Sequence, residues 1–407
     1  MKAHSFILAL LVIVGCPVWV RAEEPAPRVV GLDEVLAAAR QAPAYAAARA
    51  HSHAAAMAAE AAGGLPPTTM TLGTSRLQAR FIAGVQVPLP LFGRLGAARD
   101  VARAEHQAAR ADASKVDLVL FHDVTVAWYG LAHSQSRAEL AAAQATRATR
   151  LAQVAHHRFE AGDVPRQDAV QADAGAARAV AEAKSEQAQV EAASAGLAML
   201  LGWDPTFSLR ARGGLPDRFP SAPSLQFLEA RLDFHPALAA ADAQVAAARA
   251  RVVAASRDQW PQLSLGTEVE GFDPTLPGGP ELRTMLNLDL PLFGRRSAAR
   301  DTAEAERTAA QADRASLLSR ERGTLVAAYQ RYQAAQLQAR NFARDVVPAA
   351  EDAAHLSEVA YQGGQGGLVS VLDAERALAD IKREWVDARL TAATALADLQ
   401  LATGGIW

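Results

Sequence analysis

One strand-to-helix junction occurs twice in this chain, and the duplication constrains the fold more than any other feature of the sequence. "PLPLFGRLGAARD" (88–100) returns as "DLPLFGRRSAARD" (289–301), 201 residues later in a chain of 407. Prolines stop a strand ladder and glycine permits a tight turn, so each copy predicts the end of a strand and the start of a helix. The sequence therefore predicts two copies of one structural unit.

The second copy contains additional residues between its strands. Pro43 recurs as Pro236, and "LGT" at 72–74 recurs at 265–267, both 193 residues later. The spacing then rises to 201 residues at the junction, so eight extra residues lie between these two markers, within "EGFDPTLPGGPE" (270–281). Because this stretch is rich in Pro and Gly, we expect it to form a loop.

Each copy also carries two segments in which apolar and polar residues alternate, which predicts one β-hairpin per copy. Each segment is about as long as a tilted membrane-spanning strand, although an ordinary half-buried hairpin would show the same alternation. The residues on the more apolar face are Met70, Leu72, Thr74, Phe81, Ala83, Val85, Val87 and Leu89 in the first copy, and Leu263, Leu265, Thr267, Val269, Leu282, Thr284, Leu286, Leu288 and Leu290 in the second.

A long helical tract follows each junction. The first, 94–161, has no proline, and at 1.5 Å per residue it would reach roughly 100 Å. The second, 295–362, contains only Pro348. Helices of this length exceed a globular core, and their many alanines allow close packing of helix axes. We expect Gly162 and Gly364 to end these helices at tight turns, after which an ascending helix follows.

The expected fold class is therefore mainly α with membrane β, built from a duplicated helix–strand–strand–long helix–turn–helix repeat. We assign 23–201 to the first repeat and 225–407 to the second. The Pro- and Gly-rich segment 202–224 is the linker between them, and we expect it to be irregular.

The N-terminus has the pattern of an export signal. A positive residue precedes the apolar run "FILALLVIVG" (6–15), which is too short to span a bilayer, and small or apolar residues favour cleavage after Ala22. Residues 1–22 are thus expected to be a signal peptide. The alternative is a lipoprotein signal in which Cys16, the only cysteine, is lipidated.

Several function classes are disfavoured by the sequence. The net charge of −3 provides no basic field for nucleic acid, and no motif for an enzyme or a cofactor site is present, so we expect a protein that is neither an enzyme nor a cofactor binder. The histidines in "HSH" (51–53) and "HH" (156–157) could bind a metal or could be ordinary surface residues. We expect surface residues, because positions i and i+2 of a helix point to different faces.

The signal peptide, the duplicated strand-to-helix junctions and the helical hairpins, taken together in this order, resemble the TolC-like outer-membrane efflux factors. The resemblance covers nearly all of the mature chain and is carried by the two PLPLFGR junctions, by "YQGGQGGLVSVLDAERAL" (361–378) and by the signal peptide. It implies a homotrimer whose 12-stranded outer-membrane β-barrel continues into a periplasmic α-helical barrel. It also implies a passive exit duct in a tripartite efflux system, with outer-membrane lipid, a periplasmic adaptor and an inner-membrane pump of the resistance–nodulation–division type as partners.

Strand arithmetic agrees with a trimer. Four strands per chain cannot close a barrel, and open strand edges are not tolerated in lipid, so chains must associate. Two chains would supply eight strands, and three would supply twelve, which leave room for a lumen. The alternative is a periplasmic coiled-coil adaptor or structural protein. The compact first hairpin resembles the heavy-metal cation branch of the family, but the sequence leaves metal cations and drugs open as substrates.

The resemblance assigns roles to two groups of residues. At the barrel–helix junction, the prolines stop the strands, the glycines allow the turns and the aromatic rings, with Trp260, lie at the membrane interface. These junction residues are Pro90, Phe92, Gly93, Pro291, Phe293 and Gly294. At the periplasmic tips, the family carries acidic rings and contacts the adaptor. The tip residues are Asp168, Ser370 and Asp373 for the gate, with Gly162, Gly364, Arg158 and Tyr361 for the turns and the adaptor contact. Ser370 departs from the family, which has an acidic residue at this position, and Asp168 is its equivalent in the first repeat. The two aspartates could instead be helix N-terminal acids that interact with the helix dipole.

Overall fold

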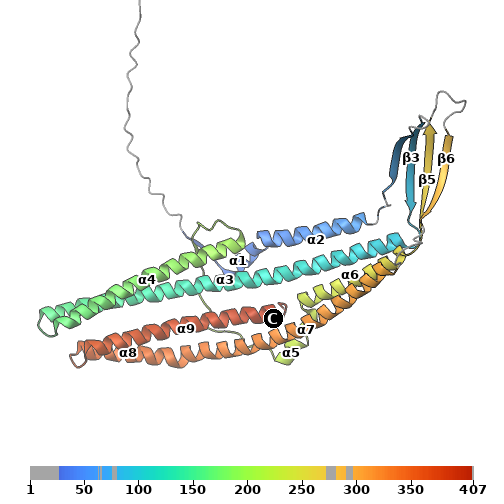
Figure 1. The fold of residues 1–407 in the computed structure, drawn as a ribbon. Coiled ribbons are helices and arrows are strands. Elements are labelled where there is room, and N and C mark those ends of the chain that lie inside the picture. Colours follow the sequence, from blue (N-terminus) through green and yellow to red (C-terminus); the bar gives the residue numbers. More distant parts are fainter. Residues whose placement is uncertain are drawn as a thin grey trace, which may run out of the picture.

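The protein is long and narrow, with a small sheet at one end and two helical hairpins at the other (Figure 1). The computed structural model describes residues 27–62, 64, 67–75, 80–271, 281–289 and 297–405. Two helical tracts, 94–160 and 298–362, run along the body, and shorter helices lie beside them (Figure 1). The C-terminus lies about midway along the body rather than at either end (Figure 1).

The order of elements confirms the duplicated repeat. The first copy comprises α1 (Leu32–Ala39), α2 (Pro43–Ala61), β2 (Thr69–Ser75), β3 (Arg80–Leu89), α3 (Arg94–Glu160) and α4 (Arg166–Leu201). The second comprises α5 (Leu225–Glu229), a 3₁₀ turn (Leu232–Phe234), α6 (Pro236–Asp258), β5 (Gln262–Gly271), β6 (Glu281–Asp289), α7 (Ala298–Asn341), a π-helical turn (Phe342–Val346), α8 (Val347–Gln362) and α9 (Leu368–Ala402). The predicted loop 270–281 falls mostly outside the described residues.

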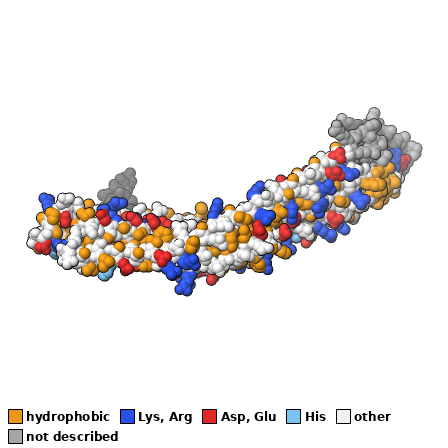
Figure 2. All heavy atoms as spheres, turned by 90° about the horizontal axis from the view of Figure 1, so that it is seen from below, with side chains coloured by type: hydrophobic (Ala, Val, Ile, Leu, Met, Phe, Trp, Pro, Cys, Tyr) orange, Lys and Arg blue, Asp and Glu red, His pale blue; other side chains and the backbone are white. Residues whose placement is uncertain are grey.

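The two hairpins form one antiparallel sheet in the order β2-β3-β5-β6. Val85 of β3 pairs with Thr267 of β5, so the copies meet at the centre of the sheet. The predicted alternation is confirmed, because apolar residues of neighbouring strands share one face of this sheet. That face is exposed in the single chain: the relative solvent-accessible surface is 66% for Met70 and 68% for Leu282. Hydrophobic side chains accordingly gather at this end of the molecule (Figure 2). The opposite face is polar and partly shielded.

The long helix α3 confirms the prediction for the first copy, with 67 residues. Alanines make much of its buried seam, including Ala145, Ala152 and Ala155, which lets the neighbouring helices approach closely. The second tract is helical but not uniformly α-helical. Pro348 cannot donate a backbone hydrogen bond and its ring crowds the preceding turn, so a wider π-helical turn precedes it. None of the described helices is both long and apolar enough to cross a membrane.

The inter-repeat linker is more ordered than predicted. Strand β4 (Leu209–Ala211) lies within it and pairs in parallel with β1 (Arg28–Val30), a strand that the sequence analysis did not predict. Three residues are too few to show a periodic pattern, and the pairing depends on a segment far away in the sequence. Trp128 of α3 fixes this small sheet by donating its indole N–H to the Val30 carbonyl, at 3.2 Å.

In each copy, the C-terminal end of the helix that follows the tip turn meets the N-terminal end of the helix that precedes the β-hairpin. Gly202 ends α4 with φ of 70°, and a Cβ there would lie 2.6 Å from Cδ of Pro43, the first residue of α2. Gly404 ends α9 with φ of 71°, and its Cβ would lie 2.8 Å from Cδ of Pro236, the first residue of α6. Only glycine satisfies both the left-handed backbone and the close contact.

Candidate functional site

The two hairpin tips have the same local geometry, and each has the tight turn predicted at Gly162 or Gly364. Gly162 has φ of 80° and Gly364 has φ of 75°, the left-handed conformation that ends an α-helix. The backbone N–H of Asp163 donates to the carbonyl of Arg158 at 2.9 Å, and that of Gln365 donates to Ala360 at 2.9 Å. Each long helical tract therefore ends with a Schellman-type cap.

A contact between Arg158 and Tyr361 joins the two tips. The Arg158 guanidinium lies 4.7 Å from the centroid of the Tyr361 ring and donates to the Tyr361 carbonyl at 3.3 Å. Tyr361 is only 2% exposed and packs with Ala155, Leu368 and Val371. Its hydroxyl is buried and has no hydrogen-bond partner among the described residues. The ring and the carbonyl, rather than the hydroxyl, therefore connect the hairpins.

The acidic tip residues occupy different environments. Asp168 is the third residue of α4 and partly exposed, so interaction with the helix dipole applies to it. Asp373 is exposed and is the sixth residue of α9, beyond the first turn, where the dipole effect fades. It lies 3.6 Å from Arg376 on its own helix. Ser370 is exposed on the first turn of the same helix.

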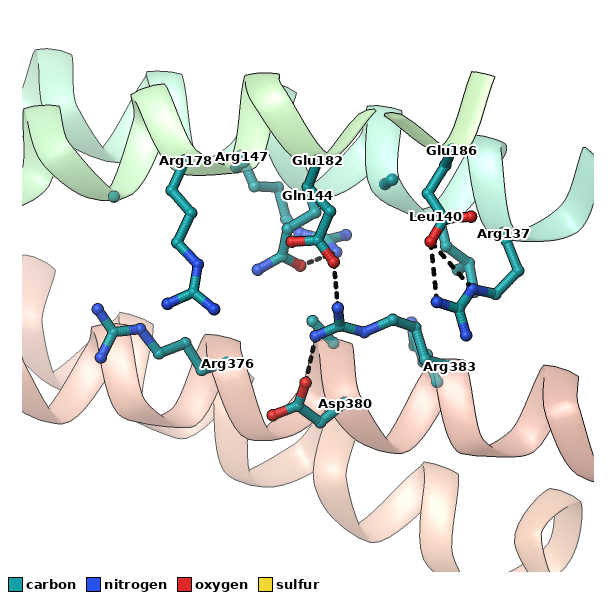
Figure 3. Close-up of a pocket in the computed structure, with 15 residues that line it drawn as sticks. Arg137, Leu140, Gln144, Arg147, Arg178, Glu182, Glu186, Arg376, Asp380 and Arg383 are labelled. Carbon is teal, nitrogen blue, oxygen red and sulfur yellow. Dashed lines mark hydrogen bonds and ion pairs between the residues drawn. The ribbon is translucent and has the colours of Figure 1, made fainter. Parts of the chain in front are cut away.

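Above the tips, a row of ion pairs connects the first hairpin, α3/α4, to α9 of the second. Arg383 of α9 pairs with Glu182 of α4 and with Asp380 of its own helix (Figure 3). Arg137 of α3 reaches Asp387 of α9 at 3.2 Å, and Arg147 lies 3.3 Å from Glu375. Sequence reasoning missed these pairs because charges occur on every exposed helix face, and only packing brings particular ones together.

Two α3 histidines also contact α9, and these too were missed. His122 lies between Asp123, at 2.9 Å, and Asp398, at 2.8 Å, and His133 contacts Asp387 at 2.7 Å. The hydrogen bond that the His122 ring donates to Asp398 raises the pKa of His122, and Asp123 adds to this effect, although burial opposes it. Both histidines therefore link α3 of the first copy to α9 of the second.

The histidines of 51–53 and 156–157, which the sequence analysis weighed as metal ligands and expected to be surface residues, have other partners or are exposed. His156 lies 2.9 Å from Asp173, His157 lies 3.7 Å from Glu160, and the histidines at 51 and 53 are exposed. Among the described residues, no group of three or more His, Cys, Asp or Glu side chains is placed to hold a metal ion.

At the sheet end, the first junction has the predicted geometry. Strand β3 ends at Leu89, directly before Pro90, and Gly93 has φ of 73° at the start of α3. Phe92 also adopts positive φ, at 60°, and stacks on Trp260 with ring centroids 5.3 Å apart. Both rings are about half exposed, as expected for an interfacial position. The second-copy residues Pro291, Phe293 and Gly294, and Cys16, lie outside the described residues.

Sequence comparisons match almost the whole chain to one family. The family model described as outer membrane efflux protein matches residues 32–203 and 228–405. The cobalt-zinc-cadmium resistance protein CzcC of Cupriavidus metallidurans is 27% identical over 299 residues, which cover 73% of this chain and 70% of that protein. Protein CyaE of Bordetella pertussis is 35% identical over 179 residues, covering 42% of this chain and 38% of that one.

Solved structures share the fold. The outer membrane protein VceC of Vibrio cholerae superimposes with a TM-score of 0.75 at 23% identity, covering 92% of this chain and 96% of that chain. CusC gives 0.77 at 17% identity, covering 92% of each chain. The open state of the MtrE outer membrane channel of Neisseria gonorrhoeae gives 0.74 at 20% identity, covering 92% of this chain and 89% of that one.

Proposed function

This chain belongs to the family of outer membrane efflux proteins, and we propose that it forms a homotrimeric exit duct for divalent heavy-metal cations. It is an outer-membrane efflux channel with a large periplasmic helical part. The family is one of channels rather than enzymes. The alternative interpretation, a periplasmic coiled-coil adaptor, is therefore wrong.

The proposal of a trimer rests on the open four-stranded sheet. β2 and β6 form its edges, and its apolar face, with Leu286 64% exposed, is uncovered in a single chain. Lipid can cover that face, but it cannot satisfy the unpaired backbone groups of the two edges. Three chains would join β6 of one copy to β2 of the next and close twelve strands, in the manner of the family's trimeric channels.

The mass of the detergent-extracted protein tests this assembly. Light scattering combined with refractive index, which separates protein from detergent, is expected to give about three chains per particle. A stable monomer that retains its β-strand circular dichroism would contradict the proposal, because its sheet edges would then be open.

The proposed partners follow from the family's place in tripartite efflux. We expect a periplasmic adaptor to contact the tips at the exposed turns of Gly162 and Gly364 and at the half-buried Arg158. The prediction that Tyr361 also contacts the adaptor does not fit its position, because it is only 2% exposed and supports the tip from within. We expect a pump of the resistance–nodulation–division type to deliver the substrate. Cross-linking from a cysteine introduced at the exposed residue Gln365 is expected to capture the adaptor. A cysteine at Met199, which is 72% exposed at the other end of α4, serves as the control.

The proposed substrate class is supported by the relative named for cobalt, zinc and cadmium resistance. In a trimer, Asp168 and Asp373 would each occur three times around one axis, and such rings attract cations. In a strain that lacks its own copy, the restored gene is expected to raise tolerance to zinc, cobalt or cadmium salts. Restored tolerance to organic drugs alone would refute the metal assignment and leave the channel assignment intact.

The proposed gate consists of the tip residues Asp168, Ser370 and Asp373, closed by the contact of Arg158 with Tyr361. Arg158→Ala removes both links of this arginine to the second hairpin and is expected to raise single-channel conductance in a planar bilayer. Arg166→Ala, at an exposed position of the same tip, removes the same charge without this contact and is the matched control. Equal conductance of the two variants would refute the role of Arg158.

A further inference from the structure

Beyond its tips, the protein contains a strongly basic cleft between its two hairpins. A cavity of about 140 Å³ lies among α3, α4 and α9 (Figure 3). Its basic lining residues are Arg137, Arg147, Arg178, Arg376, Lys382 and Arg383. Only three lining residues are acidic, Glu182, Glu186 and Asp380. The cleft is above the turns, since Arg178 is 12 residues beyond Arg166, the first residue of α4, or roughly 18 Å along that helix.

All three lining carboxylates are already engaged. Glu182 and Asp380 both pair with Arg383, and Glu186 accepts a hydrogen bond from Arg137 at 2.8 Å. They therefore cannot fully neutralise the remaining cations of the cleft.

Two further cations of the cleft find carboxylates outside its lining. Arg147 lies 3.3 Å from Glu375, and Lys382 contacts Glu351 at 2.5 Å. These pairs leave Arg178 and Arg376 as the remaining basic groups.

Arg178 and Arg376 are thus the incompletely neutralised pair. Among the described residues, Arg178 has no carboxylate partner, and Arg376 has only Asp373, 3.6 Å away and exposed on the same helix. Figure 3 shows both side chains extending into the gap between the hairpins, one from α4 and one from α9. Both residues are exposed and border the same cleft, and like charges there repel, which opposes the neighbouring ion pairs that hold the hairpins together.

We propose that Arg178 and Arg376 bind one small oxyanion between the hairpins. Planar guanidinium groups match the oxygen geometry of phosphate and carboxylate groups, and charge-assisted hydrogen bonds are the stronger class. The bound anion replaces the repulsion with two attractions. Because one arginine comes from each repeat, it also links α4 to α9 and favours the arrangement of the hairpins seen here.

The site lies within one chain, so its test depends neither on the trimer nor on the transported substrate. The full-length protein in detergent is heated in sodium chloride, sodium phosphate or sodium acetate at equal ionic strength and pH. Phosphate or acetate is expected to raise the apparent Tm by about 3 °C, with half-saturation at about 1 mM. The more effective of the two salts identifies the oxyanion as phosphate-like or carboxylate-like.

Variants separate this site from general salt effects. Arg178→Gln is expected to abolish the rise. Arg178→Glu places a carboxylate opposite Arg376, so its Tm in chloride is expected to equal or exceed that of the parent and to be unresponsive to either anion. Arg344→Gln, at a side chain 83% exposed on the π-helical turn, is expected to respond like the parent.

Two results would overturn the proposal. One is an equal Tm in all three salts, which means that no anion binds preferentially to the folded protein. The other is a rise that persists in both Arg178 variants, which places the anion elsewhere on the protein.

Discussion

Gly202→Ala tests whether the contact between the C-terminal end of α4 and the N-terminal end of α2 contributes to the stability of the protein. The substitution adds one methyl group at a residue with φ of 70°. The new Cβ would lie 2.6 Å from Cδ and 2.9 Å from Cγ of Pro43, distances that require one helix end to move. The proline ring is rigid and begins α2, so it cannot rotate away as a flexible side chain would.

The expected cost has two parts that can be separated. A non-glycine residue in the left-handed region costs about 1–2 kcal/mol. Insertion of a methyl group into a packed contact costs typically about 1–3 kcal/mol more. Gly214→Ala supplies the matched control, because Gly214 has φ of 65° and no heavy atom lies within 4 Å of the position that a Cβ would take there. We therefore expect about 1–2 kcal/mol for Gly214→Ala and about 2–5 kcal/mol for Gly202→Ala.

Thermal unfolding in detergent, followed by circular dichroism at one scan rate, measures the difference as apparent Tm. Gly202→Ala is expected to unfold at a clearly lower temperature than Gly214→Ala. Adding Pro43→Ala to Gly202→Ala is expected to restore part of the loss, because the two changes affect one contact and are not additive. Equal Tm values for the two glycine variants, or no restoration by the second substitution, would refute the reasoning.

Three further predictions concern the tips and the contact between the copies. Asp373→Asn is expected to weaken block by divalent cations in a planar bilayer without altering assembly. Unchanged block in that variant and in the double variant with Asp168→Asn would show that neither acid gates the channel. His122 has a raised pKa in the folded protein, so its stabilising contribution is complete below about pH 6.5 and is lost as the pH rises through the folded pKa. The Tm advantage of the parent over His122→Gln is therefore expected to shrink from pH 6 to pH 8, whereas a constant difference would contradict the assignment. Tyr361→Phe removes a buried hydroxyl that has no partner among the described residues and is expected to leave stability unchanged or slightly higher. A marked loss of Tm would mean that this hydroxyl has a partner in the assembled protein.

Local pattern was sufficient to predict most of the repeat. Alternation over 81–89 and 263–269 predicted strands with one apolar and one polar face, and glycines at 162 and 364 predicted turns, because these features depend on residues adjacent in the sequence. The candidate tip residues came from the resemblance, and their functional roles remain proposals. The contact of Arg158 with Tyr361 joins residues 203 apart, and no local rule predicts its geometry.

The sequence by itself thus determined the duplicated repeat, the long helices and the two-faced strands. Each depends on periodicity or on the conformational limits of Gly and Pro, which act over a few residues. Only the tertiary structure decided that β3 pairs with β5, that Gly202 meets Pro43, and that Arg178 and Arg376 share one cleft. These features require segments far apart in the sequence to meet, and the partner of each depends on how whole helices and strands pack.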